Sequence, residues 1–526
     1  MASLNSNFSL IGVAVATTTV LLVFLLGRVI YNVHFHPLRR FSGPLFWRAT
    51  RLGYVMGMLK GTIVFDVLDM FNRYGPIVRI APNELAFLDP EAWRDIYGHR
   101  IADHYGFDEM DKYQTFYRTR GVPPSIMTDN RENHALLRRQ LSYGFSEKSM
   151  REQEPIIGGY VDLLMRQLRA RCATKEESAE AGEYTKKPSL QPLDMRAWYN
   201  WTTFDVIGDL AFGEPFGCLE KAEYHPWVKT IIKFLMSSVI VSSLKLLGFH
   251  SIMSLIVRFG MRVRKEHRQR LREKMERRVA KGDRPDLIQG LLRKKDDWNM
   301  DMGRLLTNAS LLIIAGSETT ATSLSGVTYL LLKNPECMRK LTEEVRSTFR
   351  TEDEITMTSV GILPYMLACL NEGLRRYPPA SFGLPRVTPK GGARIAGVFV
   401  PEDTAVSVWQ WAAYHSTRNF AQPFDFLPER WLDNPHGDKL DAVQPFSIGP
   451  RNCIGRNLAF AEMRLVLARL VFNFDMRLAD PDQDWMKQKV YVIWDKPPLN
   501  VYLTPVSSRL PQMSAKEHAR SQVRHL

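Results

Sequence analysis

The stretch around Cys453 restricts the structure of this 526-residue chain more than any other, because a cysteine lies there between two glycines in the segment 446–459, FSIGPRNCIGRNLA. Gly449 comes before the cysteine and Gly455 follows it. Glycine adopts backbone angles that are closed to residues with a Cβ, so both positions let the chain pass close to a flat bound group. From Ile454 onward the apolar residues recur at helical period, which predicts a helix that begins beside the cysteine.

The sulfur of Cys453 would therefore lie near a helix N-terminus, where unpaired backbone amides favour the thiolate over the thiol. A thiolate presented in this way is suited to ligate a metal. Arg451, just before the cysteine, would pair with a carboxylate of the bound group. The segment alone also fits a buried structural cysteine, the commonest situation of a free thiol in proteins.

The complete segment resembles the haem-binding signature of the cytochrome P450 family, Phe-x-x-Gly-x-Arg-x-Cys-x-Gly. It agrees with that signature at every fixed position: Phe446, Gly449, Arg451, Cys453 and Gly455. The resemblance implies the cytochrome P450 fold, which is mainly α with small β-sheets (α+β). It also implies that these residues bind heme b and that the Cys453 thiolate is the axial metal ligand of its iron.

Composition excludes several other classes of protein. No Gly/Ser- or Pro-rich linker divides the chain, which favours one large domain on a short anchor. The five cysteines are an odd number and are widely spaced, which predicts a reducing compartment without a disulfide framework. A formal net charge of +14 indicates nucleic acid, an anionic membrane or an acidic partner. Because no nucleic-acid motif accompanies the charge, we expect no nucleic acid among the partners.

Residues 8–27 carry no charge and are rich in aliphatic side chains. Their length suits a helix that crosses a bilayer core of about 30 Å, so we predict a transmembrane anchor over residues 8–30. A cleaved signal peptide is the alternative, but no basic region precedes the run and no small-residue cleavage site is evident. Basic residues after the run place the catalytic body in the cytosol and residues 1–7 in the lumen: Arg28, Arg39 and Arg40. We expect a single-pass protein of the endoplasmic reticulum membrane.

The rest of the chain divides into a connector, a catalytic domain and a tail. Residues 31–44 are predicted to form a stiff, basic, Pro-rich connector. Residues 45–505 are expected to form the cytochrome P450 catalytic domain, followed by a polar tail over 506–526. Within the domain, the irregular aromatic segment 99–129 is predicted to be a wall of the substrate pocket. The apolar stretch 227–259 is predicted to form two helices whose connection contacts membrane lipid.

A long apolar segment, residues 305–333, predicts a buried helix that contains the sequence AGSETT at 315–320. A glycine and two threonines lower helix stability, so their presence in a buried helix needs a reason. Ala315 and Thr319 fall on one stripe, where small side chains leave room for a ligand. The six residues resemble the family pattern Ala/Gly-Gly-x-Asp/Glu-Thr-Thr. This resemblance implies that Glu318 and Thr319 are catalytic residues that deliver protons during oxygen activation.

Two helical residues and a later arginine are predicted to hold the carboxylates of the haem. Residues 130–141 predict a helix on which His134 and Arg138 share one face. A solvated basic helix is the ordinary explanation, since further arginines lie in the same segment. The resemblance implies instead that His134 and Arg138 reach one haem propionate and that Arg386 reaches the second.

Glu372 and Arg375 are predicted to share a helical face at i, i+3, a spacing that usually contributes less than about 0.5 kcal/mol at a protein surface. The resemblance implies that both lock with Arg430 and stabilise the haem-binding core. Their role would be structural and not catalytic.

Three β-hairpins are predicted from alternating apolar residues around turn signals. The last of them is expected to touch substrate at its tip. In the second, Asp403 stands where the family usually has a glycine, and aspartate tolerates turn angles. The hairpins cover residues 76–88, 395–401 and 491–502.

The resemblance covers nearly the whole chain after the anchor. Within the family, the chain most resembles fungal secondary-metabolism enzymes similar to the trichothecene-pathway hydroxylases. It implies a monooxygenase that inserts one atom of O2 into a hydrophobic small molecule, and terpenoid, polyketide and alkaloid substrates all remain open. NADPH-cytochrome P450 reductase is the implied electron donor. Two alternatives keep the haem but not this reaction. One is a thiolate-haem isomerase or dehydratase, which tends to lack the acid–threonine pair, and the other is a haem-binding sensor without turnover.

Overall fold

The computed structural model describes residues 2–99, 109–118, 122–173, 191–249, 261–293 and 300–506. Three of the predictions fall partly outside these residues: the pocket wall over 99–129, the connection within 227–259 and the tail over 506–526.

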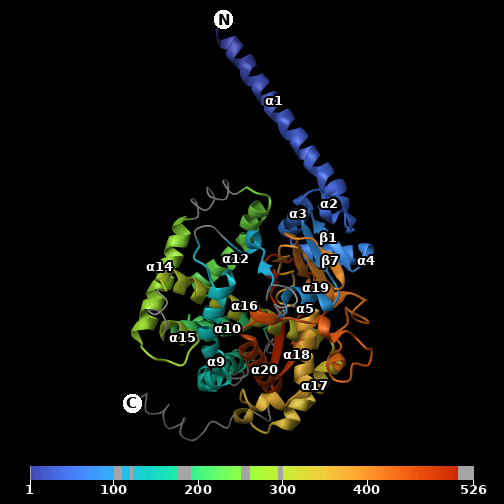
Figure 1. Cartoon of the computed structure of the whole chain (residues 1–526). Coiled ribbons are helices and arrows are strands. Elements are labelled where there is room, and N and C mark those ends of the chain that lie inside the picture. The colour runs from blue at the N-terminus through green and yellow to red at the C-terminus, as the bar shows by residue number, and fades with distance from the viewer. Residues whose placement is uncertain are drawn as a thin grey trace, which may run out of the picture.

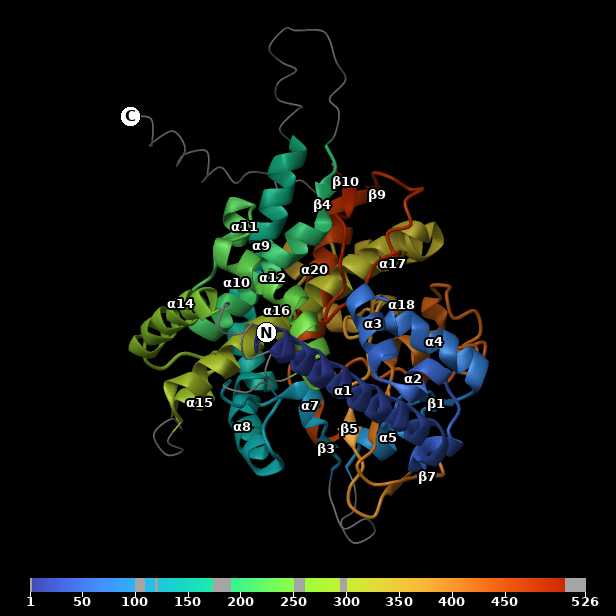
Figure 2. The same ribbon diagram turned by 90° about the horizontal axis from the view of Figure 1, so that it is seen from above.

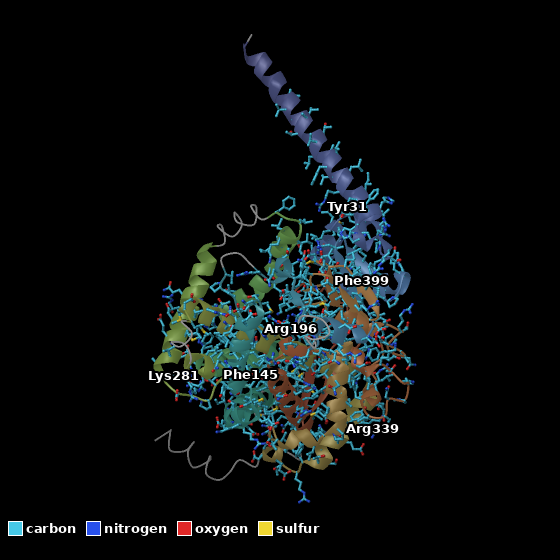
Figure 3. All side chains as sticks on the ribbon, in the orientation of Figure 1. Tyr31, Phe145, Arg196, Lys281, Arg339 and Phe399 are labelled. Atoms are coloured by element: carbon cyan, nitrogen blue, oxygen red, sulfur yellow. The ribbon has the colours of Figure 1, made fainter. Side chains whose placement is uncertain are left out.

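A helical region and a smaller region built around a β-sheet lie side by side, and one long helix extends away from the sheet region (Figure 1). The helices of the described residues greatly outweigh the strands, which confirms the predicted class of a mainly α fold with small sheets. Side chains fill the space between the elements throughout the body (Figure 3).

The extended helix is α1 (Ala2–Ile30), which continues into a π-helical turn over Tyr31–Phe35. Among the described residues, one stretch is long and apolar enough to cross a membrane: Ile11–Phe35, which contains an 18-residue window with a mean hydropathy of 2.2 and no residue buried against the body. This stretch agrees with the predicted anchor.

Hydrogen bonds fasten the base of the anchor to the sheet region. Asn32 donates from Nδ2 to the carbonyl of Ala49 at 2.8 Å, and its own carbonyl accepts from Nη1 of Arg79 at 2.8 Å. Arg79 lies in β1 (Ile77–Ala81) and is completely buried. The connector, which includes a 3-10 turn over Pro37–Arg40, is therefore attached to the first strand rather than free.

The main sheet has the strand order β1-β2-β8-β5-β3. Strands β1 and β2 (Glu84–Phe87) pair antiparallel with Ile77 opposite Phe87, and β6 (Ala393–Ile395) pairs in the same way with β7 (Val398–Val400). These pairs confirm the first two predicted hairpins. The expected turn angle at Asp403 is also present, because its φ is 54°. The remaining strands of the main sheet are β3 (Asp111–Lys112), β5 (Arg386–Val387) and β8 (Ala405–Val408).

The third predicted hairpin, over residues 491–502, is wrong. Strand β10 (Asn500–Pro505) pairs with β9 (Phe474–Leu478) and with β4 (Leu193–Asp194), both distant in sequence. Residues 490–494 form only a tight turn with a single bridge between Val490 and Trp494. Alternating apolar residues suit any antiparallel partner, so the pattern did not specify which strand would pair.

Helix α16 (Met302–Lys333) is the predicted long helix, and it runs through the centre of the body beside α10 (Met195–Phe212) (Figures 1 and 2). Its N-terminus is capped by Asp301, whose side chain accepts from the amide of Arg304 at 2.6 Å. Helix α16 ends at Lys333, because Pro335 cannot continue it and instead begins the next helix. Most side chains of α16 are buried, which makes it the core around which the other helices pack.

The other helices surround α16 and α10 or cover the sheet. The sequence also predicts a helix over 63–74 from its helical period, and this helix is α4, while the predicted helix over 130–141 is α8. The bounds of these helices are α2 (Leu45–Ala49), α3 (Leu52–Lys60), α4 (Ile63–Tyr74), α5 (Glu91–Tyr97), α7 (Gln114–Tyr117), α8 (Arg131–Gly144), α9 (Glu147–Ala173), α11 (Cys218–Lys221), α12 (Pro226–Leu246), α14 (Met261–Ala280), α15 (Gln289–Arg293), α17 (Pro335–Thr348), α18 (Pro364–Arg376), α19 (Gln410–His415) and α20 (Arg456–Asn473).

Candidate active site

The cysteine loop folds tightly before α20. The amide of Cys453 donates to the carbonyl of Phe446 at 2.8 Å, which closes the loop. Gly449 has φ 75°, and a Cβ there would lie 1.9 Å from the carbonyl oxygen of Tyr97, so only glycine fits. Gly455 is different: its φ of −88° is open to any residue, and a Cβ would make only ordinary contacts. The argument from backbone freedom therefore holds for Gly449 and is wrong for Gly455.

The electrostatics of Cys453 are set by burial more than by the helix that follows. Burial is the largest effect and raises the pKa of its thiol, while the amide of Gly455 and the guanidinium of Arg138 act in the opposite direction. The amide at the start of the following helix lowers the pKa, as the sequence argument expected, but burial outweighs it. A thiolate here needs a bound cation, which is the situation of a metal ligand.

The side chain of Cys453 is exposed although its surroundings are densely packed. Exposed side chains also form a stripe on α16. Ala315 and Thr319 are exposed, whereas Ser317 and Glu318 beside them are buried. Since α16 packs against α10, α18 and α20 at the centre of the body, this stripe faces interior space. The hydroxyl of Thr319 donates to the carbonyl of Ala315 at 2.6 Å and so lies along the open stripe.

Gly316 serves packing rather than the open stripe. A Cβ at this position would lie 2.8 Å from Cδ1 of Ile207, so the glycine lets α10 approach α16 closely. The small residues of the AGSETT sequence therefore have two functions: one contacts a neighbouring helix, and two leave space inside the body.

The residues predicted to hold the haem carboxylates form one cationic cluster. Arg138 donates from Nη1 to the carbonyl of Asn452, next to the cysteine, at 2.5 Å. Arg386 donates to the carbonyl of Met110 at 3.1 Å, and its buried Nε has no partner. Burial lowers the pKa of His134 to about 3, and the charges of four cations, Arg451 foremost, act in the same direction. His134 is therefore neutral, and the cluster around it attracts anions.

Sequence reasoning did not identify two further charged residues that lie beside these cations. Lys112 lies within the same charged group, because burial and the charges of Arg386 and Arg451 hold its pKa well below the ordinary value. Glu109 accepts from Nε and Nη2 of Arg451 at 2.9 Å, and its second oxygen is buried without a partner. Both residues lie in the segment that the sequence identified only as an irregular pocket wall, where no periodicity marks the direction of a side chain.

Glu318 points away from the open stripe. Its carboxylate forms a buried ion pair with Lys496, and Oε1 also lies 3.5 Å from the hydroxyl of Thr322. Glu318 and Thr319 are adjacent in sequence but lie on two different faces of α16, one buried and one open. Lys496 lies in the segment that was predicted to form the third hairpin, and nothing in the sequence linked it to the acid.

The three residues predicted to be structural form one buried network of hydrogen bonds and ion pairs. Glu372 accepts from Nε and Nη2 of Arg375 at 2.9 and 2.7 Å, and from Nε of Arg430 at 3.3 Å. All three side chains are completely buried. Trp431 donates to the same carboxylate at 3.0 Å, so the network joins α18 to the turn over Pro428–Trp431.

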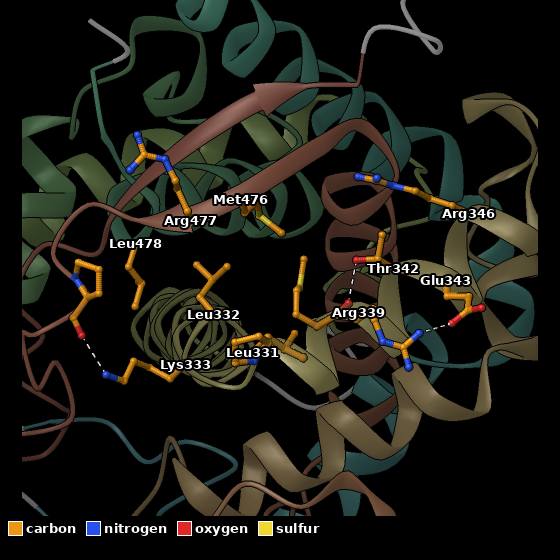
Figure 4. Close-up of a pocket in the computed structure, with 13 residues that line it drawn as sticks. Leu331, Leu332, Lys333, Arg339, Thr342, Glu343, Arg346, Met476, Arg477 and Leu478 are labelled. Carbon is orange, nitrogen blue, oxygen red and sulfur yellow. Dashed lines mark hydrogen bonds and ion pairs between the residues drawn. The ribbon is translucent and has the colours of Figure 1, made fainter.

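One groove, with a volume of about 820 Å³, lies elsewhere, between the C-terminal end of α16, α17 and β9 (Figure 4). Its lining includes Leu331, Arg339 and Met476. At a rise of about 1.5 Å per residue, Leu331 lies roughly 18 Å along α16 from Thr319. The groove therefore belongs to a different part of the surface and contains none of the predicted site residues.

These features define a class of protein with an exposed cysteine in a tight loop before α20 and an open stripe on a central helix. The chain belongs to the cytochrome P450 family, whose model, described as Cytochrome P450, matches residues 42–503. This span lies within the predicted catalytic domain and connector.

The chain is similar over almost its full length to fungal enzymes. It is 46% identical over 502 residues to "Cytochrome P450 monooxygenase tpeC" of Talaromyces stipitatus, covering 94% of this chain and 95% of that protein. It is 43% identical over 500 residues to "Trichothecene C-15 hydroxylase" of Fusarium sporotrichioides, covering 92% and 96%. The protein is thus a cytochrome P450 monooxygenase of fungal secondary metabolism, with a haem-thiolate cofactor, O2, a substrate and an electron donor.

The residues present fit a haem. Cys453 would supply a sulfur ligand, the cationic cluster suits the two carboxylates, and the unpartnered Nε of Arg386 would offer them a donor. A bound haem would supply the chemistry that activates O2, and a thiolate ligand favours O–O cleavage.

Proposed function

We propose that this monooxygenase inserts one oxygen atom from O2 into a hydrophobic intermediate of a secondary-metabolite pathway, by hydroxylation or a related oxidation. Cys453 is the iron ligand, and Phe446 packs beside it with its ring 5.3 Å from that of Phe460. The observation that carries the proposal is the exposure of Cys453 in a tight loop, together with that of Ala315 and Thr319 on a helix whose side chains are mostly buried. A substrate that reaches this space must be largely apolar, since the core around it is apolar.

We also assign the cationic cluster and the proton-handling residues. His134 and Arg138 contact one haem propionate, and Arg386 and Arg451 contact the second. Thr319 offers its hydroxyl on the open stripe, and Glu318 supplies the acid-base group behind it. For each substrate molecule, two electrons and two protons convert the second oxygen atom to water.

The electrons come from NADPH-cytochrome P450 reductase, which we place on the cysteine side of the body. Arg139 on α8 and Arg456 at the start of α20 are exposed on helices that flank the cysteine loop. Exposed cations suit an acidic partner, and the net charge of +14 supports this sign.

The protein lies in the endoplasmic reticulum membrane with α1 as a single span, residues 1–7 in the lumen and the catalytic domain in the cytosol. Apolar side chains around the base of the anchor support contact with lipid, because they are exposed together on the last turn of the anchor and on α2 and α3. These side chains are Tyr31, Phe35, Leu45, Phe46, Leu52, Met56 and Leu59.

Microsomes that contain the full chain and a fungal reductase test the proposed reaction. Candidate terpenoid, polyketide and alkaloid intermediates are supplied with NADPH under 18O2. We expect a product heavier by one labelled oxygen atom. Thr319→Val should lose product and release hydrogen peroxide, while Thr319→Ser, which keeps the hydroxyl, should restore product. An unlabelled isomer or dehydration product formed without NADPH would contradict the proposal.

A further inference from the structure

Lys496 reaches the acid of α16 from the far end of the chain. Its ammonium contacts Oε1 of Glu318 and donates to the hydroxyl of Thr322 at 2.7 Å. The side chains of Lys496 and Glu318 are 4% and 5% exposed. Ions are rarely buried without a purpose, because removal of both charges from water costs several kcal/mol that their attraction must offset.

The segment that carries Lys496 is fixed on two sides. Arg196 of α10 donates to the carbonyl of Lys496 at 2.8 Å and is itself paired with Asp194 at 2.7 Å. On the other side, the ring nitrogen of Trp485 donates to the carbonyl of Pro497 at 3.2 Å. The ammonium is therefore placed beside α16 by the backbone around it, and not by a flexible surface loop.

Two phenols also interact with the charge of Glu318. Tyr224 lies just before α12 and Tyr377 just after α18. Burial raises the pKa of both phenols, and the negative charge of Glu318 acts in the same direction. Both are neutral donors at physiological pH. Among the described residues, Lys496 is the cation that forms an ion pair with Glu318.

We propose that Lys496 is a positioning residue for proton delivery: its ammonium holds the carboxyl group of Glu318 in a fixed place behind Thr319, from which Glu318 takes up a proton and passes it on. The inference rests on the proposed roles of Glu318 and Thr319. It assigns a new residue to the reaction, outside the signature segments of the chain. It also gives the segment after Val490 a function that does not depend on contact with substrate.

The test uses the haem-loaded full chain in membranes with a fungal reductase, NADPH and O2, and no organic substrate. Consumption of NADPH and O2 and release of hydrogen peroxide are measured across pH. One NADPH per O2 yields peroxide, and two yield water, so the ratio reports proton delivery. The variants are Lys496→Met, Lys496→Arg, Glu318→Gln and the double variant Glu318→Gln/Lys496→Met.

We expect Lys496→Met to shift the NADPH:O2 ratio towards peroxide and to slow O2 consumption about tenfold at neutral pH. Lys496→Arg keeps the charge and should stay within about threefold of the wild type. The double variant should match Glu318→Gln, because both residues act through one carboxylate.

Two results separate this inference from the proposed function. If Glu318→Gln alters the ratio and Lys496→Met does not, Lys496 has only a packing role and the inference is overturned. If Glu318→Gln leaves the ratio and pH profile unchanged, the proton role of Glu318 is wrong and the inference falls with it. Haem content, read from the absorbance spectrum, controls for folding. Should Lys496→Met fail to retain haem, Lys496→Gln replaces it under the same criteria.

Discussion

Glu372→Gln tests the buried network that joins α18 to the turn over Pro428–Trp431. The wild-type carboxylate accepts from Arg375 at 2.7 Å and from Arg430 at 3.3 Å, all three side chains being completely buried. The glutamine removes the negative charge and leaves Arg375 without an anion in the core. Loss of one partner of a buried ion pair costs about 3–5 kcal/mol of unfolding free energy.

This cost converts into a modest change of melting temperature, because the domain is large. The matched family region, residues 42–503, has an unfolding entropy of about 1 kcal/mol/K at roughly 2.1 cal/mol/K per residue. We therefore expect Tm to fall by about 3–5 °C, followed by circular dichroism and by loss of haem absorbance.

An exposed pair with the same spacing provides the control. Glu336 and Arg339 also lie at i, i+3, with oxygen and nitrogen 2.9 Å apart, but their side chains are 63% and 60% exposed. Glu336→Gln should leave Tm nearly unchanged, because water and salt screen an exposed ion pair. Equal effects of the two substitutions would refute the argument that burial decides the contribution of this network.

Two further outcomes follow from charges near the cysteine helix. Burial raises the pKa of Glu462 to about 8 from an ordinary 4.5, so the native state holds a proton that the unfolded chain loses. The free energy of unfolding of the wild type should therefore fall by up to a few kcal/mol as the pH rises from about 5 to 8. In Glu462→Gln, the urea concentration at the unfolding midpoint should change less over that pH range. Arg138→Met removes the donor to Asn452 beside Cys453 and should speed haem transfer to apomyoglobin about tenfold, whereas exposed Arg139→Met should not.

Local patterns predicted the elements that depend on local sequence. Helix α16 was visible from its apolar length, and α4 from its helical period. The hairpin of β1 and β2 was visible because its partners are joined by a short turn. In each case the residues that decide the structure lie within a few positions of one another.

Long-range contacts were not predictable from such patterns. Lys496 and Glu318 are 178 residues apart in sequence, and neither position carries a signal for the other. Strand β10 alternates as a hairpin strand would, yet its partner β9 lies before a long intervening segment. The effect of burial on the pKa of Cys453 was not visible in the sequence for a related reason, since burial depends on the whole fold whereas the helix N-terminus is local.

The proposed site depends on the claim that the Cys453 sulfur is the ligand of the haem iron. The carbon monoxide spectrum of the reduced protein tests this claim most directly. The wild type should show the red-shifted band of a thiolate-ligated haem. Cys453→Ser should lose this band, while Cys172→Ser, at a half-buried cysteine on α9, should keep it. A wild-type protein without the band, or a Cys453→Ser variant that retains it, would contradict the assignment.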